Sequence, residues 1–269
     1  MNAHLFADST IMLRRSLRRM RRYPSLTLFV AGIPVVLMLL FVYVFGATLG
    51  AGLGGVAAQA AGGDRAAYLA YVVPGILLVG VAGSGQGTAI SVAMDMTQGI
   101  IARFRTMAIA RSSVLAGHVL GSVLQTLLAT AIVVLVALLI GFRPTTGPLA
   151  WLAAVGLLTL VAVAVSALCA ALGLAANSVE TASNSPMFLT LLPFLSSGFV
   201  PTASMPGPVG WFAEHQPFTP ITETLRGLLV GTPIGSTGLV ALAWCVVIAV
   251  AGYGWAMRLY ERLPTHPGA

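Results

Sequence analysis

The sequence predicts an all-α integral membrane protein with six transmembrane helices, an amphipathic helix at the N-terminal end and a re-entrant segment before the last span. Composition is the first observation. Hydrophobic residues make up 58% of the 269 residues and charged residues only 8%, whereas an average soluble domain carries about 25% charged residues. The second observation is six stretches without Asp, Glu or Arg. Each can hold a helix of about 20 residues, the length that crosses a bilayer.

The N-terminal segment, residues 1–24, is predicted to form an amphipathic helix on the cytoplasmic leaflet. Leu13, Leu17 and Met20 recur at helical spacing, and six arginines fill the surface between positions 14 and 22. A basic face beside an apolar stripe suits a helix that lies on anionic lipid. The alternative is a charge cluster that only sets the topology.

A single transmembrane domain is predicted for residues 25–258, followed by a cytoplasmic tail at 259–269. The six spans are expected at 26–47, 68–92, 114–140, 149–175, 185–200 and 238–257. With both termini in the cytoplasm, 11 arginines lie inside and 3 outside. Since positive residues concentrate on the cytoplasmic side, this is the predicted orientation for a bacterial inner membrane.

The cytoplasmic segment 93–112, between the second and third spans, is predicted to contact a partner protein. Ile100, Phe104 and Met107 are spaced at i, i+4 and i+7 and form one apolar stripe, with arginines beside it. A short helix of this kind can insert an aromatic anchor into a groove of a partner. The alternative is a helix that lies on lipid headgroups.

The outer segment 201–235 is predicted to be re-entrant. It contains six prolines and an apolar helix-like piece at 221–230. Glu223 and Arg226 stand three residues apart on that piece, so that they can pair. A polar pair among apolar residues suits a helix that enters the membrane and packs against protein. An ordinary exposed helix with a weak surface pair is the alternative.

Inside the predicted spans the polar residues are almost all neutral. Five of them, in the second and third spans, are candidates for a substrate path: Ser84, Gln86, Thr88, Gln125 and Thr126. His118 is the only histidine, aspartate, glutamate or arginine well inside a predicted span. Carriers driven by protons or sodium usually need buried carboxylates, so the pattern argues against ion coupling. Four glycines between positions 80 and 87 permit close helix contact, either for function or as plain packing.

Two absences in the sequence limit the chemistry of this chain. It contains no lysine, and a phosphate-binding P-loop requires one, so ATP and its Mg²⁺ can be handled only by a partner. The histidines and carboxylates do not converge on a cluster, which gives no reason to expect an enzyme, a metal site or a bound cofactor. The basic charge is explained by topology, so nucleic acid is not an expected partner.

Three stretches resemble a known family: 99–106 with Arg111, 177–206, and 217–229. In all three, the chain is similar to permease subunits of type-2 ABC exporters, especially the daunorubicin-resistance branch of actinobacteria. The third stretch is the most specific, and the similarity extends over nearly the whole chain. One departure is Ala108, where family members often have Pro, so the end of the cytoplasmic helix can differ in shape.

The resemblance implies an exporter half that dimerises with itself or a sister permease and binds two copies of a separate P-loop ATPase. Its substrate would be amphipathic: a drug, a lipid or a glycolipid. The residues expected to couple to the ATPase are Asp95, Gly99, Ile100, Arg103, Phe104, Arg105, Met107 and Arg111. The residues expected to gate the exit path in the re-entrant segment are Pro217, Phe218, Thr219, Pro220, Glu223, Arg226 and Gly227. The rival predictions are an ion-coupled carrier or channel without an ATPase, and an integral-membrane enzyme.

Overall fold

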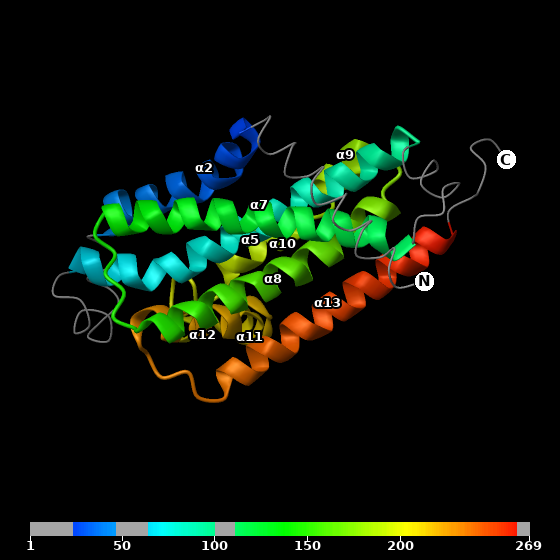
Figure 1. Cartoon of the computed structure of the whole chain (residues 1–269). Helices are drawn as coiled ribbons and strands as arrows, with labels where there is room; N and C mark the ends of the chain where they lie inside the picture. Colours follow the sequence, from blue (N-terminus) through cyan, green and yellow to red (C-terminus); the bar gives the residue numbers. More distant parts are fainter. Residues whose placement is uncertain (1–23, 47–63, 100–110, 263–269) are drawn as a thin grey trace.

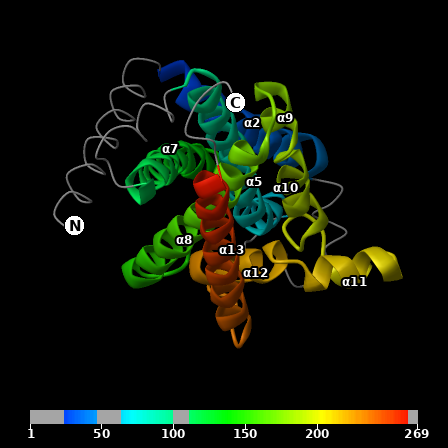
Figure 2. The ribbon, with the colours of Figure 1, turned by 90° about the vertical axis from the view of Figure 1, so that its right-hand side faces the viewer.

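The computed structural model describes residues 24–46, 64–99 and 111–262. All regular elements in these ranges are helices, and no strand occurs among the described residues. The long helices form one bundle, with the short helices α11 and α12 against its side (Figures 1 and 2). The predicted N-terminal amphipathic helix lies outside the described residues.

The described helices differ widely in length. In chain order they are α2 (Pro24–Leu40), the π-helical turn η1 (Phe41–Phe45), α5 (Asp64–Thr97), α7 (Arg111–Leu139), α8 (Pro148–Ala175), α9 (Val179–Asn184), α10 (Met187–Leu191), the 3₁₀ turns η2 (Leu192–Leu195) and η3 (Thr202–Ser204), α11 (Gly207–His215), α12 (Phe218–Val230) and α13 (Thr237–Arg262).

Four helices of the described part, α5, α7, α8 and α13, are long and apolar enough to cross a membrane. They coincide with the second, third, fourth and sixth predicted spans. Helix α5 continues to Thr97, five residues beyond the predicted end of its span at position 92. Asp95 therefore lies inside the helix rather than in a loop. It is buried, and His118 Nε2 of α7 lies 3.2 Å from its carboxylate.

The first and fifth predicted spans have a less regular structure. Helix α2 has Pro34 within it and passes into the π-helical turn η1, a rare geometry that occurs mostly as a single turn within α-helices. The fifth span is predicted as one helix over 185–200, but within that range the structure has only the short helices α10 and η2, after α9 has ended at Asn184. Pro186 and Pro193 lie at the breaks, because proline lacks the N–H that a helix interior requires. A continuous fifth span is therefore wrong, and the count of six spans stays a prediction.

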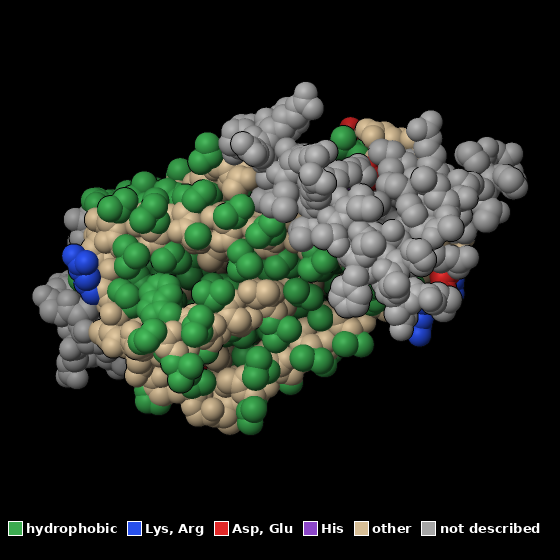
Figure 3. Space-filling view, viewed as in Figure 1, with side chains coloured by type: hydrophobic (Ala, Val, Ile, Leu, Met, Phe, Trp, Pro, Cys, Tyr) green, Lys and Arg blue, Asp and Glu red, His purple; other side chains and the backbone are tan. Residues whose placement is uncertain are grey.

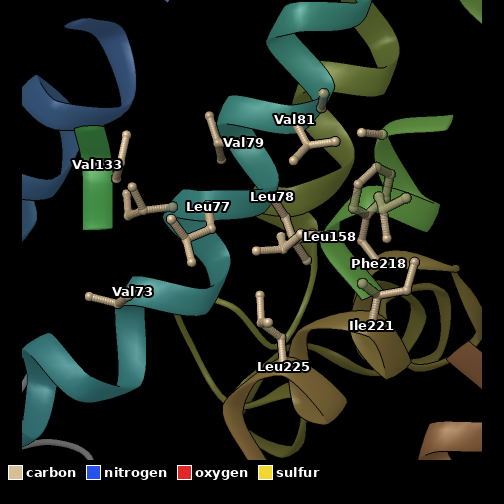
Figure 4. Close-up of a cluster of buried hydrophobic side chains, with 14 of the residues drawn as sticks. Val73, Leu77, Leu78, Val79, Val81, Val133, Leu158, Phe218, Ile221 and Leu225 are labelled. Carbon is tan, nitrogen blue, oxygen red and sulfur yellow. The ribbon is translucent and has the colours of Figure 1, made fainter. Parts of the chain in front are cut away.

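Helix α12 completes the hydrophobic core of the bundle. Its residues Phe218, Ile221 and Leu225 are buried together with Leu78 of α5 and Leu158 of α8 (Figure 4). The face shown in Figure 3 carries hydrophobic side chains over its middle, and its arginines lie at the two ends. Such an apolar band is what lipid stabilises on the outside of a membrane protein.

Small residues allow the long helices to approach closely. A Cβ atom added at Gly173 of α8 would lie 2.5 Å from the backbone oxygen of Ala89 in α5, and one at Gly85 would overlap side chains of α8. Of the glycines predicted at 80–87, Gly83 and Gly87 have no such neighbour within 4 Å. The close contact between α5 and α8 therefore depends on particular glycines and not on the whole run.

Candidate functional site

A cavity of about 390 Å³ opens between α2, α5 and α7, with Thr190 of α10 on its border. Its lining is mixed. The apolar side chains are Val30, Ile33, Pro34, Val79 and Ile90, and the polar ones are Ser84, Gln86, Thr88, Ser91, His118, Ser122, Gln125 and Thr190. Four of the five residues predicted for a substrate path line this cavity, and the fifth, Thr126, lies directly behind it.

Apart from Gln86 and Thr190, the polar residues of the cavity come from two matching helical faces. In α5 they are Ser84, Thr88 and Ser91, and in α7 they are His118, Ser122 and Gln125. Both sets have the spacing i, i+4 and i+7, which places each set on one face of its helix. The two faces meet along the length of the bundle.

Three hydrogen-bonded pairs join these faces, and we refer to them as the polar seam. Ser91 Oγ lies 3.3 Å from His118 Nδ1, Thr88 Oγ1 donates to Ser122 Oγ at 2.5 Å, and Ser84 Oγ lies 2.6 Å from Thr126 Oγ1. The pairing is antiparallel, because one helix runs towards residues 100–110 and the other away from them. Sequence spacing predicts each face, but only the packing determines which residues pair.

Helix α8 also contributes to the polar seam. Ser166, which is almost fully buried, donates to Ser122 Oγ at 2.9 Å. Ser122 therefore collects hydrogen bonds from two neighbouring helices. Buried hydroxyls need such partners, since an unsatisfied polar group in an apolar interior costs about 1–3 kcal/mol.

The two glutamines of the cavity have different surroundings. Gln86 donates from Nε2 to the carbonyl oxygen of Ser183 in α9 at 2.8 Å. Within the described residues, Gln125 makes no protein hydrogen bond, so its amide is available to a ligand. An amide on a cavity wall can orient the polar group of a bound ligand.

At one end of the seam, His118 Nε2 lies 3.2 Å from Asp95 Oδ2. Asp95 is 7% exposed, so its charge is held in a largely dry environment, where a partner is required. The sequence analysis placed Asp95 in the partner-contacting segment and found no carboxylate within a span. Asp95 nevertheless belongs to the continuous helix α5, so the argument against ion coupling from missing buried carboxylates does not hold.

A second polar cluster holds α12 against α5. Arg226 donates to the carbonyl oxygens of Ser197 at 2.7 Å and of Tyr71 at 3.3 Å, and its guanidinium carbon lies 3.9 Å from the centre of the Tyr71 ring. The Tyr71 hydroxyl donates to the same Ser197 oxygen at 2.9 Å. Burial lowers the pKa of Arg226, while Tyr71 and Glu223 act in the opposite direction; arginine remains a cation all the same.

The predicted ion pair between Glu223 and Arg226 does not form in the described structure. Arg226 is directed into the bundle, where the two carbonyl oxygens and the Tyr71 ring bind it, and Glu223 influences it only as a nearby charge. Spacing along one helix shows which side chains can meet. It does not show that acceptors from α5 and from the Ser197 turn compete for the same cation.

Other residues predicted for the exit gate hold α12 in place. Thr219 donates to the carbonyl oxygen of Ala213 and accepts from the backbone N–H of Ser197 at 3.3 Å, while Phe218 and Pro220 are buried and Pro217 precedes the helix. At Gly227 a Cβ atom would lie 2.7 Å from the backbone oxygen of Thr232. These contacts are structural, and they make α12 a fixed element of the fold.

Most of the segment predicted to contact a partner, including Ile100, Arg103, Phe104, Arg105 and Met107, lies outside the described residues. Gly99, at the edge of the described part, has φ +68°, a left-handed backbone that glycine adopts without strain. Arg111 is the first residue of α7. Among the described residues no group of three or more His, Cys, Asp or Glu could hold a metal ion.

Comparison with known proteins identifies the family. A family model described as ABC-2 type transporter matches residues 9–230. The chain belongs to the ABC-2 type transporter family. It is 29% identical over 254 residues to the daunorubicin resistance ABC transporter permease protein DrrB1 of Streptomyces coeruleorubidus, covering 94% of this chain and 85% of that protein. It is 27% identical to the probable doxorubicin resistance ABC transporter permease protein DrrC of Mycobacterium tuberculosis, over 73% of this chain and 71% of the relative.

Family membership agrees with the architecture. A multi-pass membrane permease needs several apolar helices, and four are present in the described part. The resemblance stated from the sequence is confirmed, including its actinobacterial drug-resistance branch. The burial of Asp95 was missed. A signal was available in the sequence. Asp95 and His118 lie on either side of the segment that joins α5 and α7, and two antiparallel helices bring such positions close together.

Proposed function

We propose that this chain is the membrane-spanning half of an ATP-driven exporter, and that the cavity between α2, α5 and α7 holds an amphipathic substrate. The cavity is the observation that carries the proposal. Apolar side chains of α2 can contact the hydrophobic part of a substrate, and the free amide of Gln125 can bind a polar group. A drug, a lipid or a glycolipid fits this description.

Daunorubicin and doxorubicin are the probes that follow from the relatives. The name of the Streptomyces relative refers to daunorubicin resistance, and that of the Mycobacterium relative to doxorubicin resistance. His118 is the only ionisable side chain among the described residues that line the cavity, so hydrogen bonding and apolar contact dominate recognition there.

Energy is proposed to come from two copies of a separate P-loop ATPase, which binds ATP and Mg²⁺. The absence of lysine from this chain supports the proposal, since no P-loop can be built from it. We propose that segment 93–112 contacts the ATPase, with Phe104 as the anchor and both termini of the chain in the cytoplasm. The permease would work as a dimer, either of two identical chains or with a sister permease.

The segment 201–235 is proposed to close the outer end of the substrate path. Helix α12 lies against the side of the bundle near the start of α13, away from the C-terminal end of α13 (Figure 1). The cluster of Arg226, Tyr71 and Ser197 joins it to α5, which also lines the cavity. A change in α5 that accompanies transport would therefore reach α12 directly.

The test is transport by the purified permease and its ATPase in liposomes. With ATP and the ATPase outside, we expect daunorubicin to accumulate inside the vesicles, and an ATPase variant without its P-loop lysine should abolish the uptake. Replacing Gln125 by Leu should weaken drug binding, whereas Leu128→Ala, on the exposed face of α7, should not. Uptake driven by an ion gradient without the ATPase would support the rival carrier and overturn the proposal.

A further inference from the structure

The ion pair between Asp95 and His118 joins two helices at the ends of the segment 100–110. Asp95 lies in the last turn of α5, and His118 lies two turns inside α7. The separation between His118 Nε2 and Asp95 Oδ2 is 3.2 Å, and the side chains are 15% and 10% exposed, respectively. The pair therefore connects the last turn of α5 to a point two turns inside α7.

The imidazole ring of His118 has two different environments. Together with Ser91, it lines the cavity, and Ser91 Oγ lies 3.3 Å from its Nδ1. Its other nitrogen contacts Asp95, which does not line the cavity. The Asp95 carboxylate lies 3.2 Å from Nε2 and Ser91 Oγ lies 3.3 Å from Nδ1, so any rotation of the ring changes both contacts. A ligand that touches the ring acts directly on its contact with Asp95.

The contact between Asp95 and His118 differs from the hydroxyl pairs of the polar seam. Thr88 with Ser122 and Ser84 with Thr126 join neutral hydroxyls, whose hydrogen bonds shift at little cost. The pair at Asp95 includes a buried charge, for which a change of geometry in a low-dielectric interior has a larger energetic effect. Along α5, Asp95 is also nearer to residues 100–110 than any α5 residue of the seam.

We infer that the Asp95–His118 pair transmits the occupancy of the cavity to the segment 100–110, and that Asp95 is a positioning residue for this coupling. The inference rests on the proposed function, in which that segment contacts the ATPase. A bound substrate changes the contact of the His118 ring with Asp95, and the last turn of α5 follows. Since coupling between sites is reciprocal, the nucleotide state of the ATPase changes substrate affinity through the same pair.

The test compares drug binding with drug-stimulated ATP hydrolysis in the reconstituted complex of permease and ATPase, with daunorubicin as the probe. In Asp95→Asn, the Kd for daunorubicin should stay within about threefold of wild type, because Asp95 does not line the cavity. The stimulation of ATP hydrolysis by saturating daunorubicin should fall about tenfold. A factor of this size lies within the usual range of coupling between two sites. A non-hydrolysable ATP analogue should shift the Kd in wild type but not in this variant.

Two further variants separate coupling from stability and from binding. Asp95→Glu keeps the carboxylate and should restore stimulation, a rescue that a purely structural defect at this position would not give. Gln125→Ala is the matched control: it lines the cavity without contacting the pair, so it should raise the Kd and yet allow full stimulation once the drug is saturating.

The inference is wrong if Asp95→Asn retains both the stimulation and the nucleotide-dependent shift in Kd. It is equally wrong if Asp95→Asn and Gln125→Ala show the same loss of affinity with normal stimulation at saturation. A wild-type complex that neither assembles with the ATPase nor responds to the drug would refute the proposed function, and the inference with it. The two failures are distinguished by the behaviour of the wild-type chain.

Discussion

Arg226 is the residue whose removal tests most directly how α12 is held. In Arg226→Met the unbranched stem keeps its packing, but the guanidinium that binds the carbonyl oxygens of Ser197 and Tyr71 and lies over the Tyr71 ring is lost. We expect α12 to open locally more often, while the long helices of the bundle stay folded. The predicted consequence for function is impaired export with nearly normal assembly.

The size of the effect follows from the three contacts. Hydrogen bonds to a charged donor contribute about 1.5–3 kcal/mol each, and a cation over an aromatic ring about 0.5–2 kcal/mol. Even the lower ends of these ranges amount to roughly 3 kcal/mol, although such contributions are not strictly additive. Since about 1.4 kcal/mol corresponds to a factor of ten, local opening of α12 should increase on the order of 100-fold.

Amide hydrogen exchange measures this opening, because exchange of buried amides follows the free energy of local unfolding. Amides within 218–230 should exchange on the order of 100-fold faster in Arg226→Met, and those in the middle of α8 should keep their rates. Glu223→Gln is the matched control on the same helix, since no ion pair joins Glu223 to Arg226; it should change the rates by less than about threefold. Unchanged exchange in Arg226→Met, or equal acceleration in both variants, would refute the reasoning.

Three further predictions concern packing, the partner and the topology. Gly173→Val should greatly reduce the yield of folded protein in detergent chromatography, because its Cβ would lie 2.5 Å from the Ala89 oxygen, whereas Gly156→Val on the exposed side of α8 should fold normally. Phe104→Ala should lower the affinity for the ATPase roughly thirtyfold, which co-purification would detect, while leaving membrane insertion intact. Full retention of ATPase binding would contradict the proposed role of Phe104 as the anchor. A cysteine at Ser204, after replacement of the two native cysteines, should be labelled by an impermeant reagent in intact cells, and labelling only after permeabilisation would reverse the orientation.

The features that the sequence predicted are those that depend on local pattern. Long apolar stretches predicted the helices α5, α7, α8 and α13, because a membrane-spanning helix is encoded by length and composition alone. The prolines near position 190 were visible too, but the prediction of one continuous span gave too little weight to the hydrogen bonds that Pro186 and Pro193 remove.

Pairing between distant residues was decided by the tertiary structure. The sequence offered Glu223 as the natural partner of Arg226, and the fold instead supplied carbonyl oxygens from residues 155 and 29 positions away. It also offered Asp95 as a loop residue, and the packing of α5 against α7 made it a buried partner of His118. The physical reason is the same in both cases. Helix formation depends on neighbours within a few residues, whereas the partner of a buried charge depends on which helices the whole bundle brings together.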